Sequence, residues 1–508
     1  MRSLLLFSWL FLAAYAIQAA PPNPMMTEVY NRLKSAIGDQ QRAWPTLEIR
    51  AGASSVLAYN QRKNIIFVDE KALAVCQSFG ANEKDAFAFL LAHEITHFYQ
   101  EHHWQEAGFA TSFLTDKTNF TKHVADEKEA DLFGAFITHL AGYQSIKLVP
   151  DIFEKVYAAY NLTAELQDYP SLPERKKTAL EVCAKVKELI QVFETANYLS
   201  ALGEHTSAAA AYEYVLQFVK YKELYNNIGA SLVAAAALQP EYGELAFHYP
   251  LELNLEIPLR DGADADKADL LQKAIEYLTI ATQMDNQHYR TFINLACAYV
   301  LKKDFAQAES LLKQLYPLVK KDKQAAEMSI LYGILAAQQQ NPTQAKKMFD
   351  EAISLTKNKG IHQLANYNKQ LLSGETITPT PPTGNSTETI DGIDLTYQND
   401  FAFKEITVQD NFSYEERSLG FYQTEKATLV HLEASDKTIA LLTTTQTKTA
   451  RDLGVGTTYQ QIKKAYTLEE AKVLSHSKGY YLVLPTFKLF FNMDAQNRVA
   501  LWGTYEVY

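Results

Sequence analysis

The most constraining feature of the sequence is the apolar run at residues 86–92, which leads directly into H-E-I-T-H at residues 93–97. We expect one helix through both stretches, beginning near Asn82 as a favourable N-cap. Four residues make just over one helical turn, so His93 and His97 project from the same face toward a shared point. Buried imidazoles and carboxylates need polar partners, so the pattern predicts a functional site inside the protein.

The chemistry that this spacing favours is metal binding. Two ring nitrogens from His93 and His97 would lie about 2.0–2.1 Å from a zinc ion. Glu94, one position along, leans toward the open side of such a site and would take the proton of a bound water. Because zinc lowers the pKa of that water toward about 7, we predict Zn²⁺ as cofactor and Glu94 as the general base of a hydrolase.

A zinc site of this kind needs a third protein ligand, and His103 is one candidate. It falls where a metzincin carries its third histidine. That arrangement needs a turn-forming glycine where Gln100 stands, and a methionine below the site. No methionine occurs between Met26 and Met284, so the metzincin interpretation fails on both counts.

Glu127 is the better candidate for the third ligand. It lies at the start of a second predicted helix, from about Asp126 to Gly142. A glutamate there gives a two-histidine, one-carboxylate site with an open position. Asp131 follows one turn later on the same face and would accept the free N–H of a zinc-bound imidazole, whereas Glu129 should face elsewhere. The alternative is that these acidic residues lie in solvent at the start of a helix, where acids are favoured, and bind no metal.

The ends and the charge of the chain limit its class. With 508 residues, two to four domains are expected, and a net charge of −11 argues against a nucleic-acid partner. Residues 1–20 combine Arg2, a short apolar stretch and small residues, as in a secretory signal, with an uncleaved anchor as the alternative. We expect a protein that is periplasmic or otherwise exported and soluble after cleavage, with membrane association through partners as a further possibility.

The domains that we predict have an α+β fold class overall. A mostly helical zincin-type metallopeptidase domain covers 21–185 and includes a hairpin of residues 55–59 and 64–68. An α-solenoid of tetratricopeptide repeats covers 186–372, a Pro- and Thr-rich linker 373–392, and a small α+β domain of unknown role 393–508.

The repeats are indicated by small residues spaced twelve apart, which let paired helices approach closely. A non-repeat helical bundle is the alternative. One copy is interrupted by residues 239–266. The repeat positions are Ala196, Ala208 and Tyr212; Gly229, Ala274, Leu278 and Ala281; Phe292, Leu295, Ala296, Tyr299, Ala308 and Leu312; and Gly333, Ala336, Ala345, Phe349 and Ala352.

The C-terminal part reads as strand-rich, with no catalytic constellation. The expected strands are 427–434, 438–444, 480–485, 487–492 and 499–502, with a short helix at 459–465. Three cysteines, Cys76, Cys183 and Cys297, are too few for a disulfide framework. Buried free thiols are expected, and one bridge between two of them is the alternative.

At this point the sequence resembles the gluzincin zinc peptidases, the family of HtpX and the CAAX prenyl protease. The resemblance rests on H-E-x-x-H at 93–97 with E-K-E-A-D at 127–131 and extends over roughly 27–360. The signal and the repeats make it closest to the soluble periplasmic BepA-like branch. It implies an endopeptidase that degrades misfolded or stalled envelope proteins, with repeats that bind clients or partner proteins.

A third segment of this family, T-H-P with a downstream arginine, corresponds here to D-Y-P at 168–170 with Arg175. Tyr169 replaces a histidine that approaches the zinc in relatives, which puts that role in doubt. The Tyr169 hydroxyl would instead hydrogen-bond the oxyanion of a tetrahedral intermediate, supported by Arg175. The alternative is a surface loop with an ordinary arginine.

The predicted function is therefore hydrolysis of unfolded protein substrates. We expect the peptide to lie extended along the hairpin edge near residues 56–59, by strand addition. The rival function is a repeat scaffold or chaperone whose metal site is vestigial. An intact general base argues against this rival, because a structural zinc site has no use for Glu94.

Overall fold

A computed structural model describes most of the chain and divides it into two compact units, Met1–Ala36 with Ala43–Val186 and Ile37–Arg42 with Lys187–Tyr508. The predicted signal segment and the linker beyond Gly374 lie outside the described residues. The described ranges are 23–38, 42–52, 56–100, 117–162, 171–240, 245–251, 266–374, 402–410, 415–423, 427–432, 437–443, 447–468, 471–476 and 479–505.

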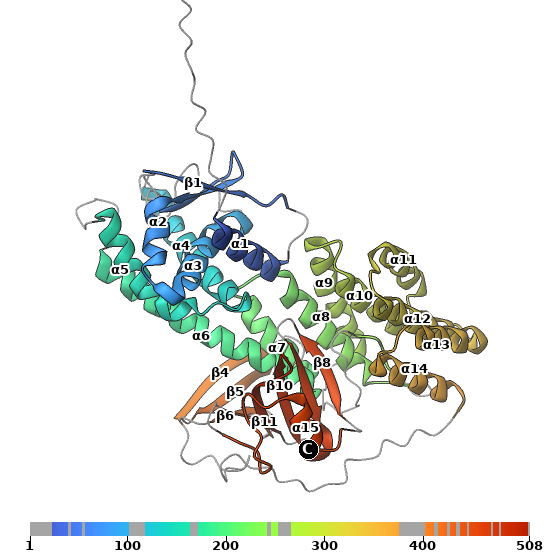
Figure 1. The fold of residues 1–508 in the computed structure, drawn as a ribbon. Coiled ribbons are helices and arrows are strands. Elements are labelled where there is room, and N and C mark those ends of the chain that lie inside the picture. Colours follow the sequence, from blue (N-terminus) through green and yellow to red (C-terminus); the bar gives the residue numbers. More distant parts are fainter. Residues whose placement is uncertain are drawn as a thin grey trace, which may run out of the picture. The chain divides into compact units, whose positions relative to one another are not determined.

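The first unit is mostly helical with one small sheet (Figure 1). Its elements are α1 (Pro24–Ile37), β1 (Thr46–Arg50), β2 (Leu57–Asn60), β3 (Ile65–Asp69), α2 (Glu70–Gln77), η1 (Gly80–Asn82), α3 (Glu83–Tyr99), α4 (Lys117–Leu140), η2 (Ser145–Leu148), α5 (Val149–Tyr160) and the first part of α6 (Leu172–Leu202).

The sheet of the first unit has the strand order β1-β3-β2. Strands β2 and β3 pair antiparallel, which confirms the predicted hairpin. Strand β1 pairs parallel to β3 and was not predicted. Its five residues, Thr-Leu-Glu-Ile-Arg, alternate polar and apolar as a strand does, but the run is short, and the pairing with β3 defines it.

Helix α3 is the core of the first unit. It begins after Asn82 as predicted, although the Asn82 side chain makes no capping hydrogen bond. Every residue from Ala86 to Tyr99 is buried, because α2, α4, α5 and β2 all pack against this helix. An apolar surface around the whole circumference is typical of a fully buried helix.

Helix α4 extends further than predicted. It begins at Lys117 rather than near Asp126, so the predicted start was wrong. Thr118, Asn119 and Thr121 are weak helix formers, which made Asp126 the more favourable start in sequence terms. The predicted end is confirmed: the helix stops at Leu140, and Gly142 adopts a left-handed φ of 85°.

The second unit contains a helical repeat region and a sheet, which the sequence analysis assigned to separate domains. Helix α6 runs through the division at Val186 and Lys187, beside the predicted boundary at 185/186. The further helices are α7 (His205–Leu216), α8 (Lys222–Ala237), α9 (Lys267–Met284), α10 (Tyr289–Leu301), α11 (Phe305–Leu315), η3 (Tyr316–Leu318), α12 (Asp322–Gln338), α13 (Pro342–Leu355) and α14 (Lys359–Leu372).

These helices form two layers (Figure 1). Helices α8, α10, α12 and α14 pack one on the next, whereas α9, α11 and α13 each pack on the preceding helix of the chain. The small repeat positions lie where paired helices meet. A methyl group at Gly333 would lie 2.5 Å from the Phe349 ring, and one at Gly229 would overlap the Leu278 side chain. The predicted helical repeats are therefore confirmed as closely packed helix pairs.

The remaining strands form one eight-stranded sheet, in the order β4-β5-β6-β7-β11-β10-β9-β8. Its elements are β4 (Ala402–Asp410), β5 (Glu415–Gln423), β6 (Ala427–Leu432), β7 (Lys437–Thr443), α15 (Tyr459–Ala465), β8 (Lys472–His476), β9 (Gly479–Leu484), η5 (Pro485–Phe487), β10 (Leu489–Asp494) and β11 (Val499–Thr504). The short helix and five strands were predicted, with Phe487 falling in η5 rather than in a strand. Strands β4, β5 and β8 were missed because charged residues interrupt their apolar patterns.

The three cysteines are free and buried. The Cys183 thiol donates to the carbonyl of Ile146 at 3.4 Å. This outcome matches the expected buried thiols and leaves no bridge among them.

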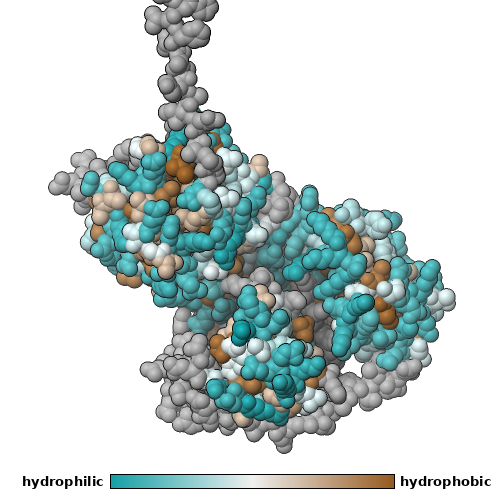
Figure 2. Space-filling model, in the orientation of Figure 1, coloured by the Kyte–Doolittle hydropathy of each residue, from teal (hydrophilic) through white to brown (hydrophobic). Residues whose placement is uncertain are grey.

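Hydrophilic residues dominate the visible surface of the described residues (Figure 2). On the face drawn in Figure 2, hydrophilic side chains cover most of the described surface, and hydrophobic residues occupy small separate areas. Among the described residues, no helix combines the length and the apolarity needed to cross a membrane.

The stability of the second unit should depend on pH through His205, the first residue of α7. Burial lowers the pKa of this imidazole to about 3, and the positive charge of Lys472 acts in the same direction. Within the described residues, His205 Nδ1 has no hydrogen-bond partner. An unfolded histidine has a pKa of about 6.5, so between these values the unfolded chain binds a proton that the folded chain does not.

We therefore expect His205 to lower the free energy of unfolding by up to about 1.4 kcal/mol for each pH unit below 6.5. Urea unfolding at pH 7.5, 6 and 5 measures this slope, and His205→Gln should flatten it. A residual slope will remain from His248, whose pKa is lowered to about 4 by burial and by Lys472. Equal slopes for the wild type and the variant would contradict the assignment.

Candidate metal centre

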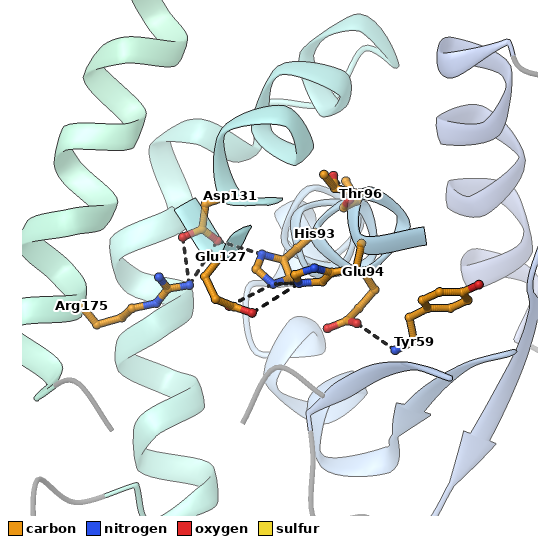
Figure 3. A network of polar contacts seen from close by, with 9 residues as sticks. Tyr59, His93, Glu94, Thr96, Glu127, Asp131 and Arg175 are labelled. Carbon is orange, nitrogen blue, oxygen red and sulfur yellow. Dashed lines mark hydrogen bonds and ion pairs between the residues drawn. The ribbon is translucent and has the colours of Figure 1, made fainter. Parts of the chain in front are cut away.

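Helices α3 and α4 bring three potential ligands together in the first unit (Figure 3). The Nε2 atoms of His93 and His97 lie 3.1 Å apart. The Glu127 carboxylate lies 3.4 Å from each of these nitrogens, one oxygen toward each ring. All three residues are buried, so the histidines and the glutamate predicted from the sequence share one enclosed point.

The three side chains lie close enough together to bind a single metal ion. An ion with bonds of about 2.0–2.1 Å holds its ligand atoms about 3.3–3.4 Å apart. The two ring nitrogens lie 3.1 Å apart, and each lies 3.4 Å from a different oxygen of Glu127, so the three side chains are close enough to share one ion. Two imidazoles and a carboxylate are also a donor set that zinc accepts in hydrolytic sites. The residues present therefore fit Zn²⁺, with one coordination position left for solvent or substrate.

Helix α4 reaches this position because it carries a glycine facing α3. Glu127, Asp131 and Gly134 recur at intervals of four and three, which places them on one face of the helix. A Cβ on Gly134 would lie 3.0 Å from the main-chain nitrogen of His93 and 3.1 Å from the carbonyl carbon of Ala92. Gly134 was not predicted from the sequence, although a glycine inside a helix, seven residues after a candidate ligand, is the signal that could have revealed it.

Asp131 holds the His93 ring from the side opposite the ligand atoms. Its Oδ1 lies 2.9 Å from His93 Nδ1, which leaves Nε2 directed toward His97 and Glu127. Arg175, on α6, pairs with the same carboxylate at 2.9 Å and lies over the Phe153 ring. Arg175 therefore acts on the site through Asp131, as a positioning residue, rather than at the oxyanion position expected from the sequence.

Glu94 lies beside the ligands and is itself buried, with 1% of its surface exposed. The main-chain N–H of Tyr59 on β2 donates to Glu94 Oε2 at 2.9 Å. Glu94 Oε1 is buried and has no hydrogen-bond partner among the described residues. Burial raises the pKa of this carboxyl, against the opposing effect of the two histidines. One oxygen is thus oriented by the strand, and the other remains available to accept a proton.

The electrostatics of the cluster favour a bound cation. Burial lowers the pKa of His93, but Glu127 and Asp131 outweigh this effect and raise it to about 10. Burial likewise raises the pKa of Glu127, and His93 and His97 outweigh it and bring that pKa well below its usual range. The network of Figure 3 includes three buried carboxylates and one guanidinium. A metal ion would displace the imidazole proton, and with both imidazoles neutral and the three carboxylates ionised the network carries an excess of two negative charges, which a divalent cation would balance.

The remaining predicted site residues have different outcomes. Glu129 is exposed, as expected for the opposite face of α4. Tyr169 and the rejected candidate His103 lie outside the described residues. The contribution of Tyr59 was missed because it comes from a main-chain N–H, which has no signature in the sequence.

Comparisons with known proteins identify no family. No family model matches this chain, and no curated protein matches it. A thermophilic TPR protein of Thermus thermophilus aligns at 13% identity over 48% of this chain and 99% of its own, with a TM-score of 0.26. YrrB, described as a TPR protein with an unusual peptide-binding site, aligns at 16% identity over 49% and 97%, with a TM-score of 0.25. These scores are too low to bear on function. The assignment of the helical repeats is based on the packing of the helix pairs in this chain.

Proposed function

We propose that this chain is an exported zinc endopeptidase of the gluzincin type, which cleaves unfolded or misassembled proteins of the cell envelope. The observation that carries the proposal is the convergence of three buried side chains that could hold a metal ion, His93, His97 and Glu127, next to the buried carboxylate of Glu94. A structural zinc site usually has four protein ligands and needs no adjacent base. The arrangement therefore supports hydrolysis over a purely structural metal.

In this proposal each residue has a defined task. Zn²⁺, when held by His93, His97 and Glu127, supplies polarisation of the scissile carbonyl and a lowered pKa of water. Glu94 Oε1 accepts the proton of the attacking water and later delivers it to the leaving amine. The Tyr59 N–H keeps the Glu94 carboxylate in the orientation that this transfer needs.

The substrate would pair with β2. This strand is the outer member of its sheet, with β3 as its neighbour on one side. On its other side the Tyr59 N–H reaches Glu94, so a peptide added along that edge would pass directly beside the general base. Strand addition recognises the main chain and is tolerant of sequence. This tolerance suits a peptidase that acts on extended, unfolded substrates.

Metal analysis of the purified full-length protein tests the proposal. We expect one zinc ion per chain, and cleavage of an unfolded substrate such as reduced casein that stops with a chelator and returns with zinc. Glu127→Gln removes a ligand, so zinc affinity should fall by more than the 10- to 100-fold typical of outer residues. Glu129→Gln, an exposed change on the same helix, is the matched control. Cleavage that resists chelation would exclude the zinc mechanism.

A second candidate function is a non-catalytic scaffold or chaperone. The observation that favours it is the layer of α8, α10, α12 and α14, a repeat surface of the kind that binds other proteins. Complementation separates the two functions, since a scaffold needs the helices but not the general base. If Glu94→Gln rescues a deletion strain as well as wild type does, the scaffold function is sufficient.

A further inference from the structure

A segment of the chain itself occupies the helical repeat region. Residues 245–251, with the sequence L-A-F-H-Y-P-L, belong to the long connection between α8 and α9 and form neither helix nor strand. They lie instead against α12 and α14, about a hundred residues further along the chain. Phe247 and Leu251 of this segment are buried, with 5% and 7% of their surfaces exposed. The sequence analysis had assigned no role to this insertion.

Asn368 on α14 holds the main chain of this segment through a pair of hydrogen bonds, which we call the clamp. The Asn368 side chain accepts a hydrogen bond from the His248 N–H and donates one to the His248 carbonyl, both at 2.9 Å. Asn368 has no exposed surface. Because both bonds involve main-chain groups, the clamp would hold any residue that presents its N–H and C=O in this way.

Two neighbouring contacts recognise side chains. The His248 imidazole stacks on the Tyr367 ring at 3.6 Å between centroids and an angle of 12°. Gln338, at the end of α12, donates to the Tyr249 hydroxyl at 3.0 Å. Burial and the positive charge of Lys472 keep His248 uncharged, with a pKa lowered to about 4. The site thus combines a main-chain clamp, a flat ring surface and a polar contact for a hydroxyl.

We infer that α12 and α14 form a peptide-binding site and that residues 245–251 are its built-in occupant. The external ligand is an irregular, aromatic-rich stretch of another polypeptide, with the chemistry of the segment that it displaces. Any buried segment needs partners for its main-chain groups, but here one side chain, Asn368, pairs both groups of His248, while Tyr367 and Gln338 contact the side chains of His248 and Tyr249. The site lies within the second unit and does not depend on the proposed peptidase activity.

Because residues 245–251 are part of the same chain, they compete with any external peptide for this site. A tethered segment has an effective concentration on the order of millimolar at its own site. It therefore excludes a free peptide present at micromolar concentration, and a partner must either bind tightly or present several sites at once. The built-in segment therefore prevents weakly binding partners from occupying the site.

Fluorescence anisotropy with the full-length protein tests this inference. The probe is a labelled synthetic peptide of residues 243–253, and the key variant carries seven Gly/Ser residues in place of 245–251. We expect this variant to bind the peptide at least tenfold more tightly than wild type, because its site is vacated. Adding Asn368→Ala to the variant should weaken binding about tenfold or more through the loss of two buried hydrogen bonds.

Matched controls make the outcome decisive. Asn366→Ala changes an exposed asparagine on the same helix and should leave binding unchanged, and a scrambled peptide should not bind. If the Gly/Ser variant fails to fold, the double change His248→Ala and Tyr249→Ala weakens the segment while keeping its length. Equal affinity of wild type and the vacated variants, or equal binding of the scrambled peptide, would overturn the inference.

Discussion

Replacing Glu94 with glutamine should lower the turnover of an unfolded protein substrate by about 10²–10⁴-fold, the usual contribution of a general base. Glutamine has nearly the same shape, and its carbonyl oxygen can still accept the Tyr59 N–H that now reaches Glu94 Oε2. Its amide nitrogen cannot take a proton from water. The ligands His93, His97 and Glu127 are untouched, so zinc content and thermal unfolding should stay near wild-type values.

Single-turnover cleavage of a labelled unfolded substrate, with parallel zinc analysis, measures this effect. Glu129→Gln is the same chemical change at an exposed position of α4 and should retain full activity. Undiminished turnover by the Glu94→Gln protein would remove Glu94 from the mechanism. Loss of zinc together with activity would instead show that Glu94 helps to hold the metal.

The second large effect is expected at Asp131, which joins two parts of the site. Its carboxylate contacts His93 Nδ1 at 2.9 Å and Arg175 at 2.9 Å. In Asp131→Asn the imidazole loses its charged partner, and zinc affinity should fall by 10- to 100-fold. Arg175, with 13% of its side chain exposed, is left without its carboxylate. Breaking a buried ion pair in this way costs about 3–5 kcal/mol of folding stability.

A double variant separates these two consequences. Asp131→Asn with Arg175→Gln removes the unpaired charge, so stability should return toward wild type while zinc affinity stays low. Zinc titration against a competing chelator and thermal unfolding give the two readouts independently. Asp151→Asn, an exposed change on α5, is the matched control. Recovery of zinc affinity in the double variant would show that Asp131 acts only on folding.

Much of the site could be predicted because helix geometry is local. The four-residue spacing of His93 and His97 brings their rings together in any α-helix, and the same spacing relates Glu127 to Asp131. The hairpin followed from its two apolar strands, and α3 followed from its continuous apolar run after Asn82. The start of α4 did not, because the helix continues over residues that are weak helix formers. Strand β1 was missed because its alternating pattern is only five residues long.

The sequence by itself determined which residues could bind a metal and which small residues would lie between paired helices. Only the tertiary structure decided which groups meet. Gly134 lets α4 approach α3, Arg175 pairs with Asp131 instead of an oxyanion, and Asn368 clamps the main chain of residue 248. Contacts between distant segments depend on how whole elements pack, and main-chain donors such as the Tyr59 N–H look alike at every position of a sequence.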